Sequence, residues 1–136
     1  MSTPEPVRLF YESVWNAGDL DAADDLLSGD CTFRGSLGNE LRGREAFKEY
    51  VRSVRTSLSG YRCEILACVT EGDAAFARMR FSGLHMGTFR GHAPTGKQVS
   101  WEGAAFFRFV GGIIRDIWVL GDLEELEKTL RRNKET

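Results

Sequence analysis

The chain has 136 residues and a formal net charge of −2, with 42% hydrophobic and 28% charged residues. This balance is typical of one domain spanning residues 1–136, and its interspersed charges argue against nucleic acid or an anionic membrane as partner. No apolar run approaches the roughly 20 residues of a membrane span, and the N-terminus shows no secretory signal pattern, so we expect a cytoplasmic protein.

The three cysteines, Cys31, Cys63 and Cys68, are odd in number and lack the paired spacing of a metal site. We therefore expect free, reduced thiols that pack in the core or within strands. Histidine, aspartate and glutamate show no metal-ligand spacing either, so we expect neither a metal nor a cofactor.

The N-terminal part of the chain predicts two helices. Thr3 fits an N-cap and Pro4 a first helical position. Residues 16–18 end this helix, and Asp19 fits the N-cap of a second, short one. Apolar residues spaced i, i+3, i+4 and i+7 give the first helix one buried face; they are Val7, Phe10, Tyr11, Val14 and Trp15.

A short strand over residues 31–33 and a glycine-rich loop over 35–43 follow, and then a helix over 44–58. From residue 61 the pattern changes to period-two alternation, which predicts strands over 61–69, 75–86, 97–109 and 113–120. Asp122, three residues before Glu125, predicts the N-cap of a last helix. Helices followed by antiparallel strands indicate an α+β fold with a curved antiparallel sheet and helices packed on one of its faces.

Several motifs resemble the SnoaL-like polyketide cyclases. These are residues 16–21 (NAGDLD), the glycine-rich loop, residues 83–87 (GLHMG), residues 93–97 (APTGK), Arg108-Phe109 before a Gly-Gly hairpin, and the Trp118 strand that ends at Asp122. The family belongs to the superfamily of ketosteroid isomerases, limonene epoxide hydrolases and nuclear transport factor two. The resemblance covers about residues 7–130 and implies an α+β cone, in which the curved antiparallel sheet has the helices on its concave face. It also implies a pocket for a small, mostly apolar molecule and a homodimer through the outer sheet face.

The resemblance also places the catalytic groups of these families, and most positions lack them. The essential aspartate of the last strand falls on Val119, and polar groups of the preceding strand fall on Gly103 and Ala105. The base aspartate of ketosteroid isomerases falls on Gly35, and their second aspartate near Ala105. Their pocket tyrosine is the exception, because it matches Tyr11. Both acid–base sets are otherwise largely missing.

Tyr11 and His85 are the remaining candidates for catalysis. Tyr11 would donate a hydrogen bond to a ligand carbonyl, or else be a core tyrosine. His85 would be a general base, or else a strand-end histidine bonded to backbone or water. We expect both side chains to point into one cavity, while His92 lies on the surface. Asp122 is a third candidate that fits a helix cap better.

The residues expected to line the pocket are mostly apolar and aromatic. Glu102 and Asp116 have the opposite parity and are expected on the outer face, and Arg34 is expected either at a solvated rim or beside an anionic ligand group. The inward set is Trp15, Phe33, Met79, Phe81, Trp101, Phe107, Ile117 and Val119.

Two functions stay open from the sequence. One is binding of a small hydrophobic metabolite, carbonyl-bearing or aromatic, with cofactor-free cyclase or isomerase chemistry through a non-standard acid–base set. The other is a non-catalytic ligand-binding or dimerisation module.

Overall fold

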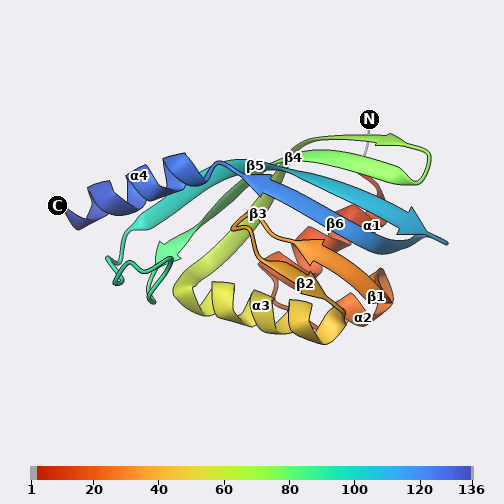
Figure 1. The fold of residues 1–136 in the computed structure, drawn as a ribbon, viewed down its shortest axis with the longest axis horizontal. Coiled ribbons are helices and arrows are strands. Elements are labelled where there is room, and N and C mark those ends of the chain that lie inside the picture. Colours follow the sequence, from red (N-terminus) through yellow and green to blue (C-terminus); the bar gives the residue numbers. More distant parts are fainter. Residues whose placement is uncertain (1–2, 136) are drawn as a thin grey trace.

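The computed structural model describes residues 3–135. Six strands form one curved sheet that does not close on itself, and helices cover its concave face (Figure 1). The strand order is β2-β1-β6-β5-β4-β3. The α+β cone with helices on the concave face is therefore confirmed.

Four long strands, paired by antiparallel hairpins, make up most of the sheet. They are β3 (Leu58–Glu71), β4 (Ala74–His85), β5 (Gln98–Val110) and β6 (Ile113–Gly121). Gly111 and Gly112, with φ of 60° and 81°, supply the left-handed backbone that the β5–β6 turn requires. Each strand lies within a few residues of its predicted range, because period-two alternation is a local signal.

β1 (Leu27–Arg34) is longer than the predicted strand, and it pairs in parallel with β6. β2 (Glu40–Arg42) forms inside the segment predicted as a loop and pairs with β1. A three-residue edge strand gives no periodic signal, which is why the sequence did not predict it.

The N-terminal helix changes type along its length. α1 (Glu5–Leu9) continues directly into η1 (Phe10–Asn16), a π-helix. The expected Thr3 cap is wrong, because Pro4 is the N-cap residue and no side chain caps this helix. Asp19 is not an N-cap either, because residues 19–21 form a turn before α2 (Ala22–Leu26).

The last two helices begin where the sequence predicts. α3 (Arg44–Ser57) packs beneath the sheet, and α4 (Leu123–Lys134) projects from one end of it (Figure 1). The Asp122 carboxylate accepts a hydrogen bond from the Glu125 N–H at 3.1 Å, so its role as N-cap is confirmed. Within residues 3–135, no helix is both long enough and apolar enough to cross a membrane.

The strand register sorts the side chains between the two faces as expected. Val119 lies opposite Ala105, and both are buried against the helices. Glu102 lies on the outer face, where it pairs with Arg78 at 3.1 Å. Asp116 accepts a hydrogen bond from the Thr32 hydroxyl at 2.6 Å. Neither carboxylate reaches the interior.

Candidate ligand-binding site

A small cavity lies between the N-terminal helix, α3 and the concave face of the sheet. Its volume is about 20 Å³, which is room for about one water molecule. It is lined by Tyr11, Trp15, Phe33, Ser36, Tyr50, Tyr61, Cys63, Phe81 and Val119. The lining contains four side-chain hydroxyls and one thiol, and it contains no carboxylate.

Tyr11 contributes the least satisfied of these polar groups. Its side chain leaves the π-helical segment, and π-helical turns are frequent at functional sites. The Tyr11 hydroxyl is buried and has no hydrogen-bond partner. Burial, followed by the nearby Cys63 and Cys68, raises the pKa of Tyr11 well above its ordinary value. The phenol therefore stays protonated and is available as a hydrogen-bond donor.

The helix that carries Tyr11 is held against the sheet by one side chain. The Asn16 amide donates to the Cys63 carbonyl at 3.0 Å and accepts from the Cys63 N–H at 2.7 Å. These two bonds complete the backbone pairing of Cys63 and fix the end of η1 beside β3. Asn16 is thus a positioning residue for Tyr11.

The other polar groups of the cavity are also protonated. Burial raises the pKa of Tyr50, Tyr61 and the Cys63 thiol far above their ordinary values. A thiol that stays protonated is a poor nucleophile. The cavity therefore presents hydrogen-bond donors and no general base.

His85 does not reach this cavity. It is fully buried near the end of β4, where its Nδ1 lies 3.3 Å from the Thr95 hydroxyl and its Nε2 lies 3.2 Å from the His92 carbonyl oxygen. Both ring nitrogens therefore have partners in the loop between β4 and β5. The expectation that His85 and Tyr11 share one cavity is not met, because β4 carries His85 past the cavity.

His92 is only partly exposed, which corrects its expected surface position. Its Nε2 lies 2.9 Å from the Glu127 carboxylate of α4, and Arg90 donates to the same carboxylate at 2.8 Å. Helix α4 covers the histidine from 35 residues away in sequence, a long-range contact that the local pattern does not predict.

The expected pocket residues divide into two groups. Trp15, Phe33, Phe81 and Val119 line the cavity. Met79, Trp101, Phe107 and Ile117 are buried in the same core but are not among the lining residues.

Four lining residues were not predicted as such: Ser36, Tyr50, Tyr61 and Cys63. Tyr61 and Cys63 alternate inward at the start of the predicted strand, and Tyr50 follows Phe47 by three residues on the predicted helix, so a signal for three of them was present.

Arg34 lies outside the cavity. Its guanidinium donates to the Val119 carbonyl and lies over the Trp118 ring, 5.3 Å from the centroid. Among residues 3–135, no three side chains of histidine, cysteine, aspartate or glutamate gather as a metal site would require.

The sequence pattern of the SnoaL-like polyketide cyclase family matches residues 5–130. The chain belongs to this family. A comparison with curated proteins gives no match.

Solved structures show the same fold as this SnoaL-like protein. A candidate polyketide cyclase from Acidithiobacillus ferrooxidans has a TM-score of 0.83 and 24% identity, over 98% of this chain and 99% of that one. TsrD from Streptomyces laurentii has a TM-score of 0.80 and 25% identity, over 96% and 98%. A SnoaL-like polyketide cyclase from Agrobacterium tumefaciens has a TM-score of 0.78 and 20% identity, over 96% and 99%.

The interior of this SnoaL-like protein is closed at two positions where the resemblance expects polar groups. A Cβ atom on Gly35 would lie 2.9 Å from the Phe33 ring and 3.0 Å from the Tyr50 hydroxyl. A Cβ atom on Gly103 would lie 2.5 Å from the Leu120 carbonyl oxygen. Neither position accepts a larger side chain without movement of its neighbours.

Proposed function

We propose that this SnoaL-like protein binds a small, mostly apolar molecule that carries a carbonyl group or an aromatic ring, in the cavity beside Tyr11. The observation that carries the proposal is the buried Tyr11 hydroxyl without a partner. An unsatisfied buried hydroxyl costs about 1–3 kcal/mol, and a ligand oxygen that accepts its hydrogen bond removes this cost. Aromatic walls such as Trp15 and Phe33 suit a flat or cyclic ligand.

The ligand enters past Tyr50. This side chain lines the inner cavity and also an open surface groove that contains Leu37 and Phe89. A cavity of about 20 Å³ is too small for such a ligand, so binding requires Tyr50 to turn outward. The groove on its other side gives the ring room to do so.

The chemistry that this lining supports is polarisation of a carbonyl group. Tyr11 donates a hydrogen bond to the ligand oxygen, which stabilises negative charge as the neighbouring carbon loses a proton. Val119 takes the place of the usual carboxylate, so the proton leaves to water or to a group on the ligand itself. The family description as polyketide cyclases supports this cofactor-free cyclase or isomerase chemistry.

Binding is tested with α-tetralone and with tetralin, its hydrocarbon analogue. Titration calorimetry with the wild type and Tyr11→Phe should show weaker α-tetralone binding by roughly tenfold in the variant, with tetralin unchanged. Tyr61→Phe is the matched control, because it also removes one phenol hydroxyl from the same lining. Equal binding of α-tetralone by wild type and Tyr11→Phe would refute the proposal.

Catalysis is tested by deuterium uptake. α-Tetralone in deuterated buffer should exchange the hydrogens next to its carbonyl faster with wild type than with Tyr11→Phe. Binding without any acceleration would support the alternative, a non-catalytic binding module.

We also propose a homodimer through the outer face of the sheet. Phe76, Phe106 and Trp118 form a row across β4, β5 and β6, and Phe76 and Trp118 are about half exposed, at 47% and 49%. Charges of both signs flank this row, including the Arg78–Glu102 pair. Such a patch is self-complementary in a twofold arrangement, which supports a second copy as the partner.

A further inference from the structure

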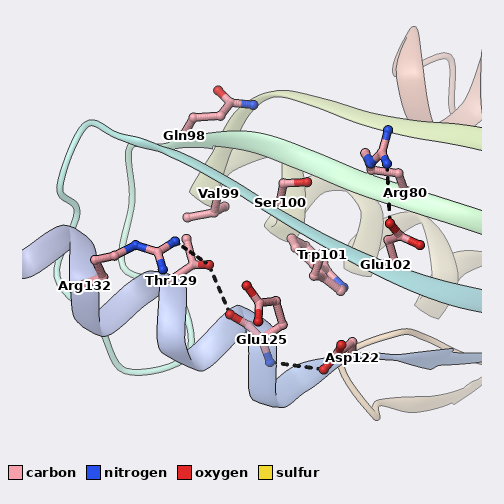
Figure 2. A pocket seen from close by; sticks show the side chains of 10 residues that line it. All are labelled: Arg80, Gln98, Val99, Ser100, Trp101, Glu102, Asp122, Glu125, Thr129 and Arg132. Atoms are coloured by element: carbon pink, nitrogen blue, oxygen red, sulfur yellow. Dashed lines mark hydrogen bonds and ion pairs between the residues drawn. The ribbon is translucent and has the colours of Figure 1, made fainter.

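A surface groove lies between β5 and α4 (Figure 2). It forms because β6 ends at Gly121, opposite Gly103, while β5 extends back to Gln98. Beyond Gly121 the neighbour of β5 on this side is helix α4 and not a strand. The groove has a volume of about 570 Å³, and it lies outside the cavity beside Tyr11.

One edge of this groove is a piece of β5 that, within the described part of the chain, has no neighbouring strand on that side. The Glu102 carbonyl accepts from the Asp122 N–H, and the Gln98 carbonyl accepts from the Asn133 side chain. Backbone groups of alternate residues point to the same side of a strand, so the Ser100 N–H and C=O also point toward α4. Among residues 3–135, no group bonds to them on that side. Unpaired edge groups of this kind are the template for an added strand.

The groove is closed at one end. The Asn133 side chain donates to the Gln98 carbonyl at 3.2 Å, and Lys97 donates to the Asn133 carbonyl at 3.0 Å. A strand that pairs with Ser100 in the direction of β6 therefore has to end beside Gln98. Arg132 lies at this end, and among the described residues its guanidinium has no carboxylate partner; it donates only to the Thr129 hydroxyl, at 3.4 Å.

The opposite end of the groove carries the Asp122 and Glu125 carboxylates (Figure 2). Glu102 also lines this end, where it pairs with Arg80 at 3.4 Å. Glu125 and Arg132 are seven residues apart on α4, which corresponds to about 10 Å of helix. Three residues of extended peptide span about the same length. The charges of the groove thus match a short extended segment that runs antiparallel to β5, positive where it enters and negative where it ends.

We propose that this groove binds the C-terminal residues of a partner protein as an added strand. The peptide backbone pairs with the Ser100 N–H and C=O, Arg132 binds the terminal carboxylate, and a lysine or arginine two residues earlier lies near Glu125 and Asp122. Trp101 also lines the groove, and its buried Nε1 donor has no hydrogen-bond partner among the described residues.

The probe is a hexapeptide that ends in Lys-Thr-Val with a free carboxylate and carries fluorescein at its N-terminus. Fluorescence anisotropy is measured with this probe, with its C-terminal amide, and with a probe in which glutamate replaces the lysine. Amidation and the Arg132→Gln substitution should each weaken binding roughly tenfold or more, and together no further, because both remove the same charge-assisted bond. Arg131→Gln is the matched control on the same helix and should bind as the wild type does.

The backbone pairing is tested at Ser100. Ser100→Pro removes the N–H and should abolish binding, whereas Ser100→Ala keeps the N–H and should bind normally. Proline is tolerated where the N–H of an edge strand faces away from its neighbouring strand. If Ser100→Pro does not fold, hydrogen exchange of the Ser100 amide in the wild type tests the same pairing. This exchange should be fast in the free protein and slow in the presence of the peptide. Equal binding of the acid and amide probes, unchanged Ser100 exchange on binding, or no anisotropy change up to about 1 mM protein would overturn the proposal.

Discussion

Val119 of β6 lies directly opposite Ala105 of β5, and both side chains are buried on the concave face of the sheet. The last strand of this SnoaL-like protein thus brings a methyl-bearing side chain to the cavity at the position where the resemblance expects a carboxylate. Within residues 3–135 no carboxylate lines the cavity, so polar chemistry inside it depends on hydroxyl groups, among them the Tyr11 hydroxyl, which is buried and has no hydrogen-bond partner.

Val119→Asp should destabilise the protein in a pH-dependent way. A buried carboxylate without a cationic partner has a raised pKa in the folded state, so the unfolded state releases its proton first. The loss of stability is therefore small below the unfolded pKa of about 3.9 and grows as the pH rises above it. Urea unfolding is measured at pH 5 and pH 8. At pH 8 the free energy of unfolding of the variant should be about 2 kcal/mol or more below that of the wild type, and at pH 5 the difference should be smaller.

Val119→Asn is the control for this effect, because it adds a polar group of similar size that does not titrate. Its loss of stability should be the same at both pH values. A Val119→Asp protein with wild-type stability at pH 8 would mean that the cavity hydrates or supplies a partner for the charge.

Much of the fold follows from local patterns in the sequence. The alternation that placed Val119 and Glu102 on opposite faces is a property of neighbouring residues, and the structure confirms it. The capping role of Asp122 is equally local. Local patterns predict these features correctly because the tertiary packing of the sheet favours the same arrangement.

The interior of the site was less predictable because it depends on long-range packing. The sequence shows that Phe33 and Tyr50 are aromatic, but only the structure shows that both crowd Gly35 and reduce the cavity to about 20 Å³. His85 keeps the inward parity expected of it, yet its neighbours are Thr95 and the His92 carbonyl. His85 faces the interior as expected, but it is the last residue of β4 and lies beyond the cavity.

Tyr11→Phe should leave the ligand-free protein as stable as the wild type or more stable, by up to about 1 kcal/mol. The substitution removes a buried hydroxyl that has no partner, and replacing such a group by hydrogen relieves its desolvation cost. Thermal and urea unfolding without ligand provide the measurement. A clear loss of stability would show that the hydroxyl is hydrogen-bonded in solution, with a water molecule in the cavity as its acceptor.

Glu127→Gln should weaken the attachment of α4 to the loop between β4 and β5. Hydrogen bonds from Arg90 and then His92 lower the pKa of the Glu127 carboxyl below its ordinary value. Its contribution is therefore present above the unfolded pKa of about 4.3 and is lost as the pH falls through the lower, folded pKa. We expect a loss of up to about 1 kcal/mol at pH 7.

The loss caused by Glu127→Gln should be smaller at pH 3, because this pH lies below the unfolded pKa of about 4.3 and the ionised carboxylate no longer makes its full contribution. Glu124→Gln is the control, because the Glu124 side chain is 82% exposed on the same helix and should have almost no effect at either pH. Urea unfolding at pH 7 and pH 3 compares the two variants. An equal loss at both pH values would indicate a packing effect of the glutamine rather than the ionic contact.

Trp118→Lys should convert the proposed dimer into a monomer. Trp118 lies beside Phe106 in the apolar row of the outer sheet face and is about half exposed, so its substitution leaves the core intact. In a twofold interface each substitution appears twice and places two like charges in one apolar patch. Sedimentation equilibrium should therefore show a dimer for the wild type and a monomer for the variant at the same concentration. Met86→Lys adds the same charge at an exposed position on the loop after β4 and should leave the dimer unchanged; a wild type that sediments as a monomer, or a Trp118→Lys variant that remains dimeric, would show that this face is not the interface.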